Sequence, residues 1–209
     1  SPRQLLQYEP LLNTFRPNDD PANRAGVKDI STEQDGFRAT ALWGDGLIVD
    51  IPATWEQDPD GNKLYAPADQ GALQLEYYCL RAEPGATLAS LVRQEEAFMK
   101  KMFRPEHRQT VGVQDVTLKS GQQAKLLTAK HRYNEQGWFV SKTLIVLDEG
   151  VQFVVQYGGP DRPDAVQLGE RMVSSVRVDG KVKEQLDDPE AWDNGSELWV
   201  PWTKTVERQ

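Results

Sequence analysis

Few residues of this chain have side chains that could do chemistry on their own, and the only cysteine is Cys79. A single cysteine excludes an intramolecular disulfide and any CxxC metal or redox motif. Cys79 shares one face of an expected strand with Leu73, Leu75 and Tyr77, and a free cysteine on an apolar face is typically a small buried hydrophobe. A nucleophilic cysteine needs a histidine or a helix N-terminus beside it, and the sequence shows neither. We therefore expect Cys79 to be a core residue.

The two histidines are the next residues to consider as ligands or catalysts. His107 follows Pro105 in a polar stretch, and His131 lies near the end of an expected strand, before Tyr133. A single histidine builds a metal site only where the fold adds carboxylates or thiolates. We expect both histidines on the surface and neither as a metal ligand.

Acidic and glycine-rich segments match known ligand-binding loops only in part. Residues 58–62 (Asp-Pro-Asp-Gly-Asn) are too short for an EF-hand calcium loop, and the acidic residues 187–190 are expected to be part of a tail. Residues 158–160 (Gly-Gly-Pro) lack both phosphate-binding glycine patterns and are expected to form a turn. Residues 194–196 form a glycosylation sequon, which matters only in a eukaryotic secretory protein. No metal or organic cofactor is expected.

Three tryptophans near the C-terminal end are the candidate partner-binding residues: Trp192, Trp199 and Trp202. Large aromatic side chains are costly to leave in water, so they cover apolar surface or bind something. We expect Trp199 and Trp202 to pack against the domain. The alternative, an adhesive segment for a protein partner, stays open.

Composition excludes several classes of function. The chain has 209 residues, with 24 Lys and Arg against 32 Asp and Glu, and a formal net charge of −8. An acidic chain without a long basic run argues against binding to nucleic acid or to an anionic membrane. No apolar stretch reaches the roughly 18–20 residues of a membrane-spanning helix. With 38% hydrophobic residues, the chain is expected to fold as a soluble protein.

Two amphipathic helices are predicted. The first covers residues 88–103, where apolar residues form one stripe, Thr87 precedes it as a cap and Pro105 ends it. The second covers residues 163–175 and begins at Pro163, a favoured first-turn residue.

Strands are predicted around these helices. Residues 37–43 and 47–51 form a hairpin, residues 73–79 alternate as a half-buried strand, and residues 56–71 form an exposed loop. Residues 110–118, 123–133, 138–147 and 151–157 form an antiparallel meander, and Val176 and Val178 begin a last short strand. If Leu147 pairs with Val151, Ile145 lies beside Phe153, which gives one apolar and one mixed face.

These elements predict an α+β fold: an antiparallel β-sheet of about six to seven strands with helices packed on it. Residues 1–36 are expected to be an N-terminal extension, 37–179 the domain, and 180–209 a tryptophan-bearing tail.

The order of these elements resembles the PsbP-like family. That family includes photosystem extrinsic proteins, the Ran-binding Mog protein and bacterial envelope lipoproteins of the DcrB type. The resemblance is carried by residues 47–55 (Leu-Ile-Val-Asp-Ile-Pro-Ala-Thr-Trp), the two helices and the meander, over roughly residues 37–179. It implies a sandwich of sheet and helices, and a binding or assembly role without catalysis.

The resemblance implies a non-catalytic module of the bacterial cell envelope, in the periplasm or at the cell surface, with an unknown protein partner. The chain starts at Ser1 without a methionine, and residues 1–4 would suit the stretch after a lipidated cysteine or a signal cleavage site. An artificially trimmed chain fits this start equally well. Two alternatives stay open: a cytosolic interaction protein, and an enzyme with unrecognised carboxylate chemistry. A pocket with two carboxylates of raised pKa would favour the enzyme.

Overall fold

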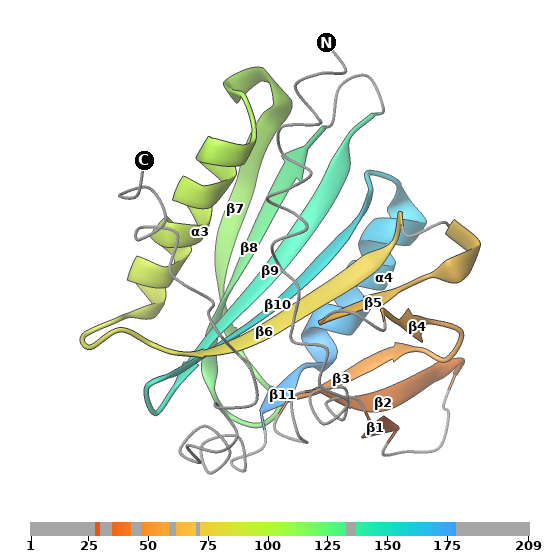
Figure 1. Ribbon diagram of the computed structural model, residues 1–209, viewed down its shortest axis with the longest axis horizontal. Coiled ribbons are helices and arrows are strands. Elements are labelled where there is room, and N and C mark those ends of the chain that lie inside the picture. The colour runs from red at the N-terminus through yellow and green to blue at the C-terminus, as the bar shows by residue number, and fades with distance from the viewer. Residues whose placement is uncertain are drawn as a thin grey trace.

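The computed structural model describes residues 28–29, 35–42, 47–58, 62–69, 72–132 and 137–178 of the chain. Of residues 28–29 only the backbone is described. These residues form two antiparallel sheets and two α-helices, α3 (Leu88–Met102) and α4 (Pro163–Ser175) (Figure 1). The predicted α+β class is therefore confirmed, as are both predicted helices.

The larger sheet has seven strands, all antiparallel to their neighbours. In spatial order they are β4 (Glu56–Gln57), β5 (Lys63–Tyr65), β6 (Gln74–Arg81), β10 (Val151–Pro160), β9 (Phe139–Asp148), β8 (Gln123–His131) and β7 (Arg108–Thr117). The predicted meander is thus β7 to β10. The prediction of a plain loop over 56–71 was wrong, because β4 and β5 extend the sheet beyond β6.

The smaller sheet contains the predicted first hairpin. Its order is β1 (Lys28–Asp29), β2 (Phe37–Leu42), β3 (Leu47–Pro52) and β11 (Arg177–Val178). The strand after α4 therefore returns to pair with β3. Two contacts hold the end of α4 and strand β11 beside β3. The Asp50 backbone N–H donates to Ser175 Oγ at 2.8 Å, and Arg177 forms an ion pair with the Asp50 carboxylate at 3.2 Å.

The main core lies between one face of the larger sheet, α4 and the smaller sheet (Figure 1). Tyr157 of β10 is completely buried there, and its hydroxyl donates to the Ala165 carbonyl of α4 at 2.6 Å. Helix and strand come this close because Gly169 faces the ring: a β-carbon on Gly169 would lie 2.3 Å from Tyr157 Cδ1.

Helix α3 covers part of the opposite face. Leu91 and Val92 pack on Ile145 and Val154 near its start, and Met99 packs on Ala129 near its end. Thr87 caps the helix in a capping box, with its hydroxyl accepting from the Ser90 N–H and Ser90 Oγ accepting from the Thr87 N–H.

The predicted register of the β9–β10 hairpin was wrong by one residue. Asp148, not Leu147, pairs with Val151, so Ile145 lies beside Val154. The connecting loop has only two residues, Glu149 and Gly150, with φ of +46° and +84°. Such two-residue turns match the twist of the strands, and here Glu149 adopts the left-handed conformation that they require.

Candidate functional site

The predicted partner-binding residues Trp192, Trp199 and Trp202 lie outside the described residues, as do the acidic residues 187–190 and the sequon 194–196. Asp60 and Gly61 of the acidic loop lie outside them as well. The prediction that the tail packs on the domain therefore stays a prediction.

Cys79 is a core residue, as expected. It lies on the buried face of β6 with 4% of its surface exposed, and burial raises the pKa of its thiol far above the ordinary range. A thiol held protonated in an apolar core is a poor nucleophile.

The surface assignment of His131 was wrong. Only 9% of its surface is exposed, and its ring stacks on Phe103 at 4.6 Å between centroids, with Phe139 at 6.2 Å on the β9 side. Burial lowers its pKa to about 4, so the imidazole is neutral at physiological pH. His107 is half-buried in the 3₁₀ turn Pro105–His107, and its backbone carbonyl accepts from the Arg132 N–H at 3.0 Å. Within the described ranges, no three His, Cys, Asp or Glu side chains are grouped to hold a metal ion.

The turn predicted at residues 158–160 was also wrong, because β10 continues through Pro160. Gly159 pairs with Val140 of β9 inside the ladder. A β-carbon there would lie 2.5 Å from Tyr157 Oη, so this glycine makes room for the buried tyrosine rather than for a phosphate.

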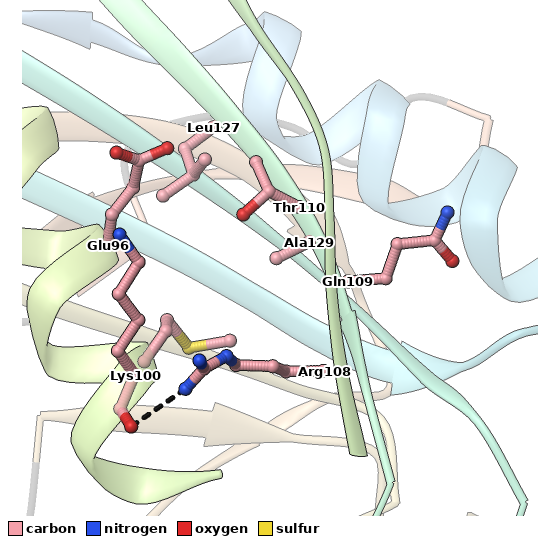
Figure 2. A pocket seen from close by; sticks show the side chains of 8 residues that line it. Glu96, Lys100, Arg108, Gln109, Thr110, Leu127 and Ala129 are labelled. Atoms are coloured by element: carbon pink, nitrogen blue, oxygen red, sulfur yellow. Dashed lines mark hydrogen bonds between the residues drawn. The ribbon is translucent and has the colours of Figure 1, made fainter. Parts of the chain in front are cut away.

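The structure reveals a small recess of about 70 Å³ between α3 and the strands β7 and β8 (Figure 2). Its apolar lining comes from Met99 of α3 and from Leu127 and Ala129 of β8. Glu96 and Lys100 of α3 contribute a charge of each sign. These residues are distant in sequence, so the sequence alone gave no signal for the recess.

Arg108, the first residue of β7, fixes the end of α3 against this strand. Its Nη1 donates to the carbonyl oxygens of Lys100 and Phe103, both at 2.8 Å (Figure 2 draws the Lys100 bond). The last carbonyls of a helix lack partners within it, and a cation there also interacts favourably with the helix dipole. The geometry of the recess is therefore set by a specific contact between helix and strand.

Strand β7 forms one edge of the larger sheet. In the part of the chain that the structure describes, it pairs with β8 alone. Val111 and Val113 of this strand are 53% and 41% exposed, the only large hydrophobic side chains so exposed among the described residues. The pairing with β8 is shifted between Thr110 and Gly112, which makes Val111 the extra residue of a β-bulge.

The start of β7 and the end of α3 form a locally basic region. Between residues 100 and 108 the chain has Lys100, Lys101, Arg104 and Arg108 against the single acid Glu106. Lys100, Lys101 and Arg104 are exposed. This excess of positive charge stands out in a chain with a net charge of −8.

Two carboxyl groups with raised pKa values lie nearer the other end of α3. Burial raises the pKa of Glu95 to about 7, and the charge of Glu76 on β6 adds to the rise. Burial also raises the pKa of Glu76, against the lowering effect of Lys63. Neither carboxyl lines the recess. Glu95 can be noticed in the sequence, because it interrupts the apolar stripe of α3 between Val92 and Met99.

No family model matches the chain, and no curated protein matches it. Among solved structures it is similar to the cyanobacterial PsbP of Synechocystis, with 16% identity over 74% of this chain and 94% of that one, and a TM-score of 0.45. A Pseudomonas aeruginosa protein of unknown function has 15% identity over 59% of this chain and 82% of that one, at 0.42. A Bacteroides thetaiotaomicron protein has 15% identity over 65% and 46%, at 0.40. At these levels membership of the PsbP-like family stays a prediction.

The sequence contains no apolar stretch long enough for a membrane-spanning helix, and the helices of the structure can be compared with that expectation. No helix of the described residues has the length and apolar character needed to cross a membrane.

Proposed function

We propose that this chain is a non-catalytic protein-binding or assembly module, and that it binds an extended segment of a partner along strand β7. The observation that carries the proposal is the edge of β7, which has no second strand partner among the described residues and has two exposed valines. An edge strand presents unpaired N–H and C=O groups, which are a template for another strand.

The two edges of the larger sheet differ in a way that supports this proposal. At one edge, β4 has only two residues, and a short edge strand is a common protection against unwanted pairing. At the other edge, β7 has ten residues and contains neither lysine nor proline. Its protective features are the bulge at Val111 and the exposed charge of Asp115, which is paired with Lys125 of β8. The bulge leaves residues 112–117 regularly paired with β8. This regular part of β7 is the proposed template.

The binding test uses the full chain and a capped synthetic peptide with a Thr-Val-Thr-Val-Thr core and uncharged ends, followed by fluorescence polarisation. The variant Val113→Lys places a charge on the edge and should weaken binding about tenfold or more. The matched control is Gln167→Lys, which adds the same charge at an exposed position of α4. Equal binding by all three proteins, or no binding by any, would contradict the proposed edge.

The bacterial envelope is the proposed location, with a lipid anchor or signal upstream of Ser1. The sequence resemblance to PsbP-like and DcrB-type proteins supports it. Fractionation of cells that make the full-length native protein should recover it with the envelope. Recovery in the cytosol would favour the alternative of a cytosolic interaction protein.

The enzyme alternative is favoured by one observation, the paired Glu76 and Glu95 with raised pKa values. Against it stands the position of the pair, because neither carboxyl lines the recess. Generic ester, glycoside and phosphate substrates test this alternative. A turnover that is present in the native chain and lost in Glu95→Gln would support an enzyme, and no turnover is expected.

A further inference from the structure

We propose that the partner segment runs antiparallel to β7, places a branched aliphatic side chain in the recess beside α3, and carries acidic residues at its C-terminal end. This inference rests on the proposed function and specifies its partner. It follows from three features of the site: the direction of the edge, the size of the recess, and the charge at the start of β7.

The direction follows from the sheet. Every pairing in the larger sheet is antiparallel, and antiparallel ladders are slightly more stable per residue than parallel ones. In an antiparallel pair the C-terminal end of the added strand lies beside the N-terminal end of β7. That end is Arg108, which is joined to the last turn of α3.

The recess selects the side chain. Thr110 pairs with Ala129 and Val113 with Leu127, so these residues share the sheet face on which α3 lies. Every second side chain of an added strand would project on the same face. A cavity of about 150 Å³ binds benzene, so a recess of about 70 Å³ suits a valine or leucine side chain and not an aromatic ring.

The charge follows from the exposed cations at the end of α3. Lys100, Lys101 and Arg104 lie where the C-terminal end of an antiparallel segment would arrive. Acidic residues at that end would meet these three exposed cations. At the other end they would meet only Lys119, because Lys125 is already paired with Asp115. Opposite charge across an interface fixes register and raises the association rate.

Two other occupants fit less well. The chain's own tail offers Trp199 and Trp202, whose rings exceed the recess. A second copy paired along β7 would bring the residues after Thr117 of one copy to Arg108 of the other. Those residues include Lys119, so positive charge would meet positive charge.

The test compares capped peptides with the same Thr-Val-Thr-Val-Thr core. One has two aspartates at the C-terminal end, one has them at the N-terminal end, and one has two asparagines at the C-terminal end. Binding to the full chain is measured at about 50 mM salt, where exposed charges are only partly screened. The C-terminal aspartates should tighten binding about three- to tenfold over both other peptides, since each exposed ion pair contributes modestly. The preference should shrink as salt rises.

The variant Lys100→Glu/Lys101→Glu should lose this preference and instead favour a peptide with two lysines at the C-terminal end. Replacing the two valines of the peptide core with tryptophan should weaken binding. Circular dichroism of the variant establishes that it is folded.

Equal affinities for all three peptides, all weakened by Val113→Lys, would overturn the acidic partner and leave the proposed edge standing. Tighter binding of the tryptophan core would overturn the aliphatic occupant. A dimer of the native chain that Val113→Lys dissociates would assign the edge to a second copy and overturn the proposal. Binding by none of the peptides would overturn the proposed function as well.

Discussion

The buried His131 predicts a specific dependence of stability on pH. Its pKa falls from an ordinary 6.5 to about 4 because the ring is buried between Phe103 and Phe139. Between these values the unfolded chain binds a proton that the folded protein does not bind. The contribution of His131 to the free energy of unfolding is therefore fully present above pH 6.5. It is lost as the pH falls toward 4.

The size of this effect follows from the shift. A change from 6.5 to about 4 corresponds to about 3 kcal/mol when titration is complete, and to about 2–3 kcal/mol between pH 7.5 and 4.5. Glu95 acts in the opposite direction, because its raised pKa gives stability below 4.5 that is lost as the pH rises to about 7. The wild-type curve alone therefore does not isolate His131.

The variant His131→Phe isolates it, since its neighbours on both sides are phenylalanines. Urea unfolding of both proteins, followed by circular dichroism from pH 4.5 to 7.5, gives two curves. The wild type should lose about 2–3 kcal/mol more than the variant over this range. Any packing cost of the larger ring is constant with pH and drops out of the comparison. Parallel curves would refute the burial of a neutral imidazole.

Three further predictions concern the elements around the site. Glu95→Gln should raise the free energy of unfolding at pH 7.5, and it should remove the pH dependence of that free energy between pH 4.5 and 7. Urea unfolding over this range measures both effects. The same pH dependence in the variant and the wild type would contradict the raised pKa of Glu95. Gly169→Ala should destabilise the protein by about 1–3 kcal/mol, although alanine favours helices. The control Gly112→Ala, where no atom lies within 4 Å of the new β-carbon, should change stability by no more than about 0.5 kcal/mol. Equal melting temperatures of the two variants in calorimetry would contradict the close packing of Gly169 on Tyr157. Thr87→Ala should cost about 1 kcal/mol through loss of the capping box at α3, with Ala89, exposed in the first turn, replaced by serine as a control that keeps the cap.

The helices could be predicted from the sequence because their signals are local. The apolar stripe and Thr87 cap define α3, and Pro163 marks the start of α4. The β9–β10 register could not be predicted, because nothing local shows that Glu149 adopts a positive φ. A shift of one residue moves each partner to its neighbour, so the predicted pairs of side chains were wrong.

The candidate site could not be predicted for a different reason. The sequence predicted a strand at residues 110–118, but strand order in space decides which strand is an edge, and that order is not local. Likewise, His131 is buried by Phe103, which follows a helix nearly thirty residues earlier in the chain. Glu95 is the exception, because a charged residue within an apolar stripe is visible in the sequence.

Amide hydrogen exchange of the full chain, with and without the peptide that carries C-terminal aspartates, tests the proposed binding edge most directly. The outward N–H groups of β7 have no ladder partner among the described residues, so they should exchange fast in the free protein. An added strand would bond them. We expect the peptide to slow exchange within Arg108–Thr117 and to leave the opposite edge, β4, unchanged. Protection at β4 or elsewhere, with none gained in β7, would contradict it.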